Sequence, residues 1–186
     1  MKIVKPRFVL LPLMLGSALV LSACSHMQSA PAYSQAALPD AVKVPDGHAV
    51  AMETVGVGEI TYECRAKADN AAVTEWVFAG PKAELLNRKG KKVGDYFGPP
   101  ATWVSDDGSS ITGTQQAVAP SGAGNIPYQL VKANASAKPG ALSGVTYIQR
   151  VALQGGVAPA SVCTQATKGK REAVRYQADY IFWKAV

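Results

Sequence analysis

The chain has 186 residues, with 19 Lys and Arg against 13 Asp and Glu, three cysteines and two histidines. This length fits one compact domain and excludes multi-domain enzymes and long repeat arrays. The 17 Gly and 12 Pro suit a fold with many turns but follow no collagen-like period.

Residues 1–23 have the pattern of a secretory signal peptide. Lys2, Lys5 and Arg7 form a positive start, and an apolar stretch follows over 8–21. This stretch contains proline and glycine and is shorter than a membrane-spanning helix requires. Without the segment, 16 basic residues remain against 13 acidic ones, a net charge of about +3. No nucleic-acid partner is expected, because such proteins usually cluster their basic residues.

The segment ends in Leu21-Ser22-Ala23-Cys24, which resembles the bacterial lipoprotein box. Small residues let the extended chain enter a peptidase, and the thiol accepts a diacylglycerol. We therefore expect Cys24 to be lipidated and to anchor the protein to a membrane; an ordinary signal peptide with a chance cysteine is the alternative. The residue after the cysteine is Ser25, whereas lipoproteins that are retained at the inner membrane resemble one another in having Asp at this position. This favours the outer membrane, with the domain in the periplasm or at the cell surface.

Residues 24–45 are expected to form a flexible tether. Much of this stretch is small, polar and aperiodic, and such a chain cannot bury a core. The turn-forming group at 44–47 then marks the start of a β-rich domain over 46–186.

Alternation of apolar and polar residues predicts the strands of this domain. Ile60, Tyr62 and Cys64 share one face of a first strand, and Trp76 and Phe78 share one face of a second. Such a period of two is typical of half-buried strands.

The clearest alternation runs over 174–182, near the end of the chain. Residues 144–153 form a further expected strand, in which Ile148 and Arg150 share the face opposite Tyr147 and Val151. Both segments are rich in the β-branched and aromatic residues that strands favour.

Turn-forming groups separate the expected strands. The groups at 88–91 and 106–109 have the composition of hairpin tips, because Gly and Asp-Gly tolerate positive φ. Longer loops are expected at 119–125 and 136–140, and no window of twelve residues shows helical amphipathicity. The pattern therefore predicts an all-β fold, a single antiparallel β-sandwich or barrel of about seven to nine strands.

Cys64 and Cys163 remain once Cys24 is assigned to the lipid. An exported chain enters an oxidising compartment, so we expect these two cysteines to form one disulfide. The closed loop of about 100 residues would stabilise the fold by roughly 4–5 kcal/mol in the chain-entropy model. A pair of metal thiolates is the alternative, but it lacks nearby His or Cys partners.

Several short motifs occur in an order that resembles one known family. They are Tyr62-Glu63-Cys64, Trp76, Gly98-Pro99 with Trp103, Asp107-Gly108-Ser109, Ile126-Pro127, Tyr147-Ile148-Gln149-Arg150-Val151, Gly155-Gly156-Val157-Ala158-Pro159 with Cys163, and Tyr176-Gln177-Ala178-Asp179-Tyr180-Ile181-Phe182. The set resembles the domain-of-unknown-function family numbered thirty-four fifty-five, found in exported bacterial and fungal proteins. The resemblance implies one exported domain with paired cysteines and no assigned activity. The run 94–103 lacks the histidine that members often carry before Gly-Pro, so no role of that imidazole carries over.

Motifs for catalysis are sparse. The sequence has no HExxH zinc motif, EF-hand loop or P-loop, so no metal or cofactor is expected. His48 is the one histidine of the expected domain and lies at its edge, which disfavours a Ser-His-Asp triad. An exported hydrolase remains the alternative, acting through paired carboxylates in an aromatic-lined cleft. The candidate carboxylates are Glu53, Glu59, Glu63, Glu75, Asp106 and Asp107.

Tyr96, Trp103 and Arg150 are the candidate binding residues. Amphipathic rings often line binding grooves, and a guanidinium in mid-strand must be paired or hydrogen-bonded. A glutamate or Asp179 is the expected partner of Arg150. Together these features favour a non-enzymatic cell-envelope lipoprotein, bound to the membrane through Cys24, that binds a small molecule or an envelope protein or has a structural role.

Overall fold

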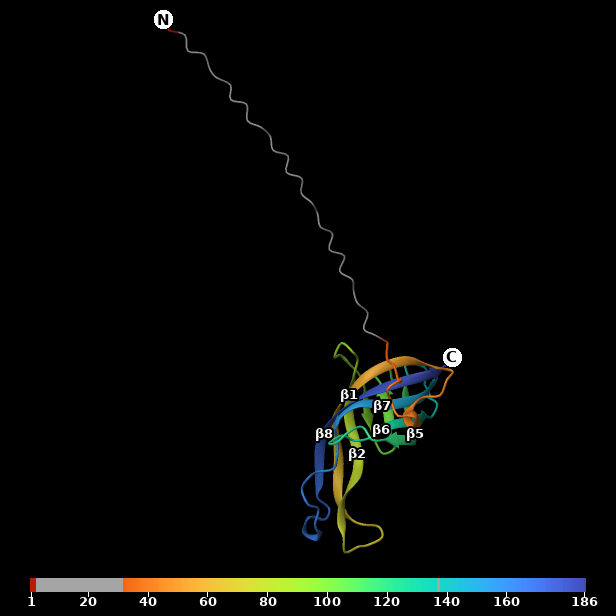
Figure 1. Cartoon of the computed structure of the whole chain (residues 1–186), viewed down its shortest axis with the longest axis vertical. Coiled ribbons are helices and arrows are strands. Elements are labelled where there is room, and N and C mark those ends of the chain that lie inside the picture. The colour runs from red at the N-terminus through yellow and green to blue at the C-terminus, as the bar shows by residue number, and fades with distance from the viewer. Residues whose placement is uncertain (3–31, 137) are drawn as a thin grey trace. The chain divides into compact units, whose positions relative to one another are not determined.

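The structure is a computed structural model that describes residues 1–2, 32–136 and 138–186. Cys24 and nearly all of the expected signal peptide lie outside the described residues. Tyr33–Val186 forms one compact unit. Its antiparallel strands make one sheet that closes on itself in chain order, because β8 pairs with β1 (Figure 1). The all-β expectation is confirmed, and of its two forms the structure takes the barrel.

The described residues of this unit form eight strands and two short 3-10 helices. They are η1 (Asp40–Val42), β1 (His48–Ala66), β2 (Thr74–Leu86), β3 (Lys92–Phe97), β4 (Thr102–Ser105), β5 (Ser110–Ala119), β6 (Tyr128–Ala133), β7 (Val145–Gly155), η2 (Gln165–Thr167) and β8 (Arg171–Ala185). Among the residues described, no helix is long and apolar enough to cross a membrane. The hairpin tips expected at 88–91 and 106–109 connect β2 to β3 and β4 to β5, as predicted.

The period of two separates the inside of the barrel from the outside. Ile60, Tyr62 and Cys64 are buried along one face of β1, as the alternation predicts. In β7, Ile148 belongs to the cluster that fills the barrel, whereas Val151 belongs to a second cluster on the outer face. The sequence pattern therefore assigned these faces correctly, because successive strand residues point to opposite sides of a sheet.

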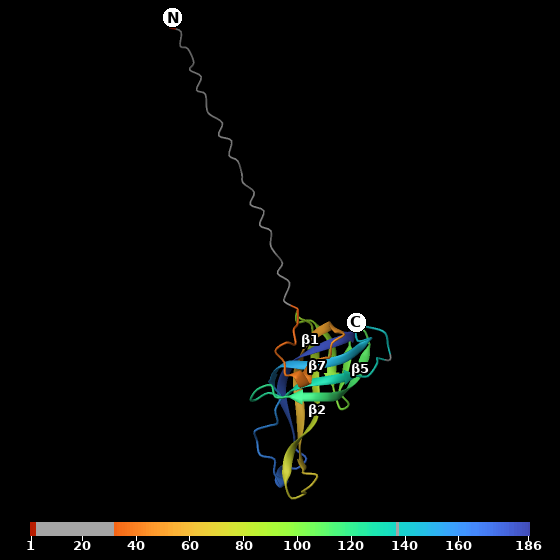
Figure 2. The ribbon, with the colours of Figure 1, turned by 45° about the vertical axis from the view of Figure 1, so that its right-hand side comes forward.

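Antiparallel strands place the connections at two ends of the barrel. One end carries the connections after β2, β4 and β6, and Leu142 from the last of these is buried there in the core. The opposite end carries the connections after β1, β3, β5 and β7. Here β1, β2 and β8 continue beyond the barrel as a three-stranded arm (Figures 1 and 2).

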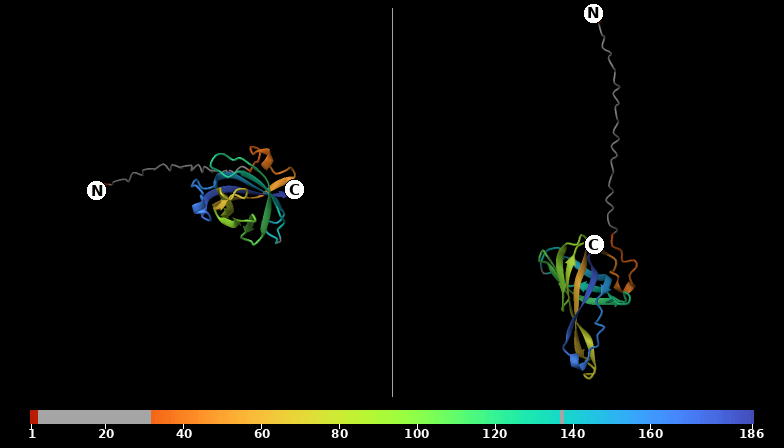
Figure 3. Two further views of the ribbon diagram at one scale, coloured as in Figure 1. Left: turned by 90° about the horizontal axis from the view of Figure 1, so that it is seen from below. Right: turned by 90° about the vertical axis from the view of Figure 1, so that its left-hand side faces the viewer.

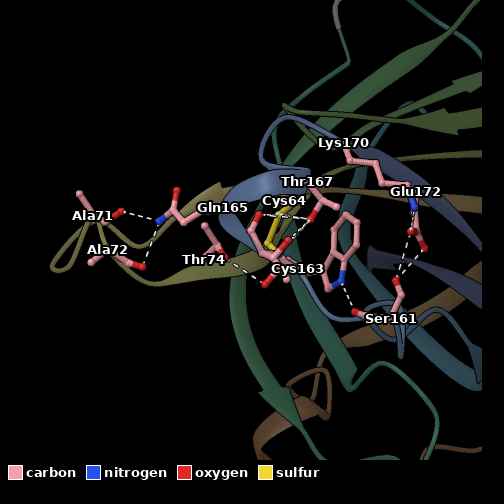
Figure 4. The surroundings of a disulfide bond; sticks show 12 residues. Cys64, Ala71, Ala72, Thr74, Ser161, Cys163, Gln165, Thr167, Lys170 and Glu172 are labelled. Carbon is pink, nitrogen blue, oxygen red and sulfur yellow. Dashed lines mark hydrogen bonds and ion pairs between the residues drawn. A yellow bond between two sulfur atoms is a disulfide. The ribbon is translucent and has the colours of Figure 1, made fainter.

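The disulfide lies in this arm and confirms the expected pairing of Cys64 with Cys163, which are 99 residues apart in the chain (Figure 4). It joins β1 to the connection between β7 and β8. Hydrogen bonds hold the same connection against β2: the Thr74 hydroxyl donates to the Cys163 carbonyl (2.9 Å), and the Trp76 indole donates to the Ser161 carbonyl (2.7 Å). The long connection is thereby fixed to the arm at several points.

Residues 33–44 lie against the outside of the barrel, whereas the sequence pattern assigned them to the tether (Figure 3, orange). Val42 and Val44 are only 1% and 3% exposed, and they pack in one cluster with Ile181 and Trp183 of β8. Burial of these apolar side chains offsets the entropy of ordering the segment.

One buried side chain, Gln149 of β7, fixes this segment to the barrel. Its amide oxygen accepts hydrogen bonds from the Tyr33 hydroxyl (3.2 Å) and the Trp183 indole (2.9 Å). Its amide nitrogen donates to the Gln35 side chain (2.9 Å) and to the Val42 carbonyl (2.7 Å). Gln149 is fully buried, so these bonds satisfy a polar group that would otherwise destabilise the fold.

Replacement of this amide should loosen the segment. Gln149→Leu leaves the Trp183 indole and the Val42 carbonyl buried without a partner, so we expect the free energy of unfolding to fall by about 2 kcal/mol or more. Urea unfolding measures the loss, and hydrogen exchange should show weaker protection over 33–44. Gln154→Leu, at an exposed position of the same strand, is the matched control. Equal urea midpoints for Gln149→Leu and wild type would contradict the assignment.

Candidate functional site

A cavity of about 410 Å³ opens at the end of the barrel that carries the arm. We call it the arm-end cavity. Its lining is mostly apolar, with a polar side formed by one arginine and two glutamines: Ile60, Tyr62, Phe78, Pro81, Tyr96, Gly98, Pro99, Ala101, Gly113, Gln115, Ile126, Pro127, Gln129, Val131 and Arg150. The volume lies in the range of small-molecule sites, and an eight-stranded barrel has room for one small ligand.

The rim of the cavity depends on a bulge in β2. The register between β1 and β2 shifts between Thr61 and Tyr62, and next to this shift Gly80 has a φ of +150°. A Cβ at Gly80 would lie 2.1 Å from the Gly98 carbonyl oxygen, so a glycine is needed for β2 to pack against the β3–β4 connection. Just before the bulge, Phe78 is 51% exposed at the rim.

Arg150 projects from β7 into the cavity. Its Nη2 donates to the Pro127 carbonyl (3.0 Å), and its buried Nε has no hydrogen-bond partner among the described residues. No described carboxylate lies within ion-pair distance. The expected pairing with Asp179 is wrong: Asp179 lies on the outward face of β8, between two buried residues, and pairs with Arg88 (2.7 Å).

The aromatic candidates meet, but only one of them lines the cavity. The rings of Tyr96 and Trp103 stack with their centroids 4.7 Å apart, and Tyr180 packs against both. Trp103 is 1% exposed and belongs to the core. The structure therefore places Tyr96 and Arg150 at one cavity, and Trp103 in the packing that supports it.

The tyrosines around Arg150 are neutral. Burial raises the pKa of each of them above the usual value near 10, and the positive charge of Arg150 offsets this only in part: Tyr62, Tyr96, Tyr176 and Tyr180. The Tyr62 hydroxyl donates to the Gly156 carbonyl (2.8 Å), and the hydroxyls of Tyr176 and Tyr180 lie 3.1 Å apart. Among the described residues that line the cavity, Arg150 is the only one of a charged type, and no tyrosinate balances it.

The candidate carboxylates do not converge. Glu53 pairs with Arg88 (2.6 Å), and Glu63 pairs with Arg65 and Arg171 (both 3.0 Å). The hydrogen bonds from these two arginines lower the pKa of Glu63 to about 2. The other candidates are exposed: Glu59, Glu75, Asp106 and Asp107. None of the six lines the arm-end cavity, so the hydrolase alternative lacks the pair of acids that it needs.

Asp107 has a structural role in its turn. Its carboxylate accepts hydrogen bonds from the Ser109 hydroxyl (2.6 Å), the Ala141 amide (2.6 Å) and the Ser109 amide (2.9 Å). These bonds hold the pKa of Asp107 well below its ordinary value. The Ser109 hydroxyl also accepts a hydrogen bond from the Leu142 amide (3.2 Å), so this turn positions the leucine at the end of the barrel opposite the arm.

A larger but shallower groove of about 1190 Å³ crosses the outer face of the sheet. Several of its charges are already paired, since Lys92 contacts Glu84 (3.6 Å) and Asp95 (2.8 Å). Within the described part of the chain, no group of three or more His, Cys, Asp or Glu side chains is placed to hold a metal ion. The smaller cavity is the better candidate, because it joins an apolar wall to a cation without a counter-charge.

Sequence reasoning missed the two glutamines of the cavity. Gln129 lies opposite Arg150 in the register of β6 and β7, and its amide donates to Gln115 of β5 (2.6 Å). Consecutive residues Leu130 and Val131 are both buried, one in the outer cluster and one in the barrel, so β6 shows no alternation. No local pattern marks Gln115 or Gln129 as neighbours of Arg150.

The Asp107 turn predicts a pH-dependent effect on stability. A carboxylate with a lowered pKa stabilises the fold above the unfolded-state pKa near 4, and this contribution is lost as the pH falls below it. Asp107→Asn should therefore lower the melting temperature at pH 7, and the difference from wild type should narrow between pH 5 and pH 2.5. Differential scanning calorimetry measures both, with Asp106→Asn, in the same turn, as the control. A difference independent of pH would contradict the assigned hydrogen bonds.

Comparison with known proteins gives one match. The model of a family described as protein of unknown function, DUF3455, matches residues 45–184, which include all of β1 to β7 and nearly all of β8. No curated protein and no solved structure matches the chain. The match confirms the resemblance that the ordered motifs indicated. The barrel, its disulfide and the arm-end cavity therefore lie in the matched region, and the chain belongs to the DUF3455 family.

Proposed function

We propose that the protein is a lipid-anchored cell-envelope protein whose barrel binds a small ligand in the arm-end cavity. The observation that carries the proposal is the cavity itself, about 410 Å³ in volume, with an apolar wall and one arginine that lacks a counter-charge. Ligand sites combine these features: apolar surface supplies affinity and a few polar groups fix orientation.

The composition of the cavity favours binding over hydrolysis. Its lining, all of it within the described residues, contains no carboxylate, histidine, cysteine, serine or threonine. Apart from Arg150, Tyr62 and Tyr96 are the remaining titratable groups of the lining, and because burial raises their pKa, they supply no activated nucleophile or general base for hydrolysis near pH 7. Tyr96 and Tyr62 contribute rings and neutral hydroxyls, which suit recognition of a ligand.

The proposed anchor sets how far the barrel extends from the membrane. Cys24 precedes Tyr33, the first residue of the compact unit, by nine positions. A fully extended chain of this length spans about 30 Å at most. Because 33–44 are fixed to the barrel by Gln149, only this short stretch separates the barrel from the lipid.

Lipidation of Cys24 is tested by labelling. Cells fed tritiated palmitate should label the wild-type protein, and Cys24→Ala should remove the label because the thiol that accepts the diacylglycerol is gone. Ser25→Asp is the control, since it keeps the label and should move the protein from the outer to the inner membrane fraction. Label on Cys24→Ala would refute the anchor.

Ligand binding is tested with a neutral probe. The mature chain 24–186 with Cys24→Ser carries no acyl group, and N-phenyl-1-naphthylamine should bind it with a stoichiometry of one and increased fluorescence. Ala101→Phe places a ring in the cavity and should weaken binding at least about tenfold, a difference of 1.4 kcal/mol. Ala173→Phe adds the same ring at an exposed position of β8 and should leave binding unchanged. Binding that is insensitive to Ala101→Phe would place the probe elsewhere and contradict the proposal.

A further inference from the structure

We propose that the ligand of the arm-end cavity is an organic monoanion, an acid with an apolar body, whose acidic group pairs with Arg150. This inference rests on the proposed function and adds the chemical class of the ligand. It follows from three features of the cavity: an unbalanced cation, a divided lining and a single positive charge.

The first feature is the missing counter-charge. Arg150 is partly buried, and an opposite charge or hydrogen bonds must replace the water that its guanidinium loses there. Among residues 32–136 and 138–186, Arg150 makes one bond to a carbonyl, and its buried Nε has no partner. The carboxylates of the neighbouring strand β8 are already used, since Asp179 pairs with Arg88 (2.7 Å) and Glu172 pairs with Lys170 (2.6 Å). The acidic group of a ligand would supply the missing charge.

The second feature is the division of the lining into a polar and an apolar side. Gln129 lies opposite Arg150 in the register of β6 and β7, and Gln115 is bonded to Gln129, so three polar side chains adjoin one another. The rest of the lining is apolar, with Phe78 and Ile126 among its members. A ligand that satisfies both sides has an acidic head and an apolar body.

The third feature limits the charge of the head. Arg150 is the only charged residue among the described residues of the lining, and the surrounding tyrosines are neutral because burial raises their pKa. One guanidinium balances one negative charge, and its planar fork matches the two oxygens of a carboxylate. A free phosphate dianion carries two negative charges, of which one guanidinium balances only one. It would also leave the apolar wall of the cavity without a contact. A carboxylate or sulfonate on an apolar body therefore fits best.

Two dyes that differ by one charged group test the inference. 1-Anilinonaphthalene-8-sulfonate is the sulfonated form of N-phenyl-1-naphthylamine, so their dissociation constants compare the anion with its neutral counterpart. On the mature chain 24–186 with Cys24→Ser, we expect the anionic dye to bind at least about tenfold more tightly. Decanoate should likewise displace the dye at lower concentration than decanol, and inorganic phosphate at the same concentration should not displace it.

Variants assign the preference to Arg150. Arg150→Gln should remove the advantage of the anionic dye, so that the dissociation constants of the two dyes on this variant differ by less than about twofold. Arg175→Gln, at an exposed arginine of β8, is the matched control and should keep the full preference. If Arg150→Gln does not fold, Arg150→Lys serves instead: it keeps the charge, loses the planar fork and should reduce the preference several-fold.

The outcomes separate the two proposals. If neither dye binds with a stoichiometry of one, both the ligand-binding function and the anion preference fail. If both dyes bind equally and Ala101→Phe weakens both, the ligand cavity stands and the anion preference is overturned. A preference that survives Arg150→Gln, or displacement of the dye by phosphate alone, also overturns it.

Discussion

Closure of the sheet by pairing of β1 with β8 is the constraint on which the other features depend. In a ring of eight strands each inward side chain either fills the interior or lines what remains open. Trp103, Leu142 and Phe182 help to fill the core. At the arm end, the bulge at Gly80 and the connection 98–101 form the rim of a cavity. One ring thus has a packed end, which supplies stability, and a hollow end, which is available to a ligand.

The same closed ring decides which charges can meet. Asp179 points outward from β8 and Arg150 points inward from β7, so the barrel wall separates them although Asp179 lies opposite Val151, the neighbour of Arg150, in the register. Arg88, on the hairpin after β2, pairs with Asp179 and Glu53 on the outside. Within the described part of the chain, the inward arginine keeps a single hydrogen bond, to the Pro127 carbonyl. A cation held in this way does little for stability, which is why we assign it to ligand recognition.

Two sets of contacts outside the ring fix the segments that lie beside it. The disulfide and its hydrogen bonds fix the β7–β8 connection to the arm. On the outer wall, Gln149 fixes residues 33–44 through four hydrogen bonds, so the chain that leads from the proposed anchor begins at a defined point on the barrel. Both sets of contacts order long segments that carry no regular strand, and neither set occupies the interior of the barrel.

The sequence by itself determined the features that depend on local pattern and on chemistry. Period-two alternation identified the inward faces of β1 and β8, and turn-forming residues placed two hairpins. The expectation that the chain is exported to an oxidising compartment predicted the disulfide. Only the tertiary structure decided that the sheet closes, that 33–44 pack on the wall, and that Arg150 has two glutamines rather than a carboxylate beside it. The physical reason is that alternation reports which face a residue occupies. The partners on that face come from strand pairings between segments far apart in the chain, which no local pattern encodes.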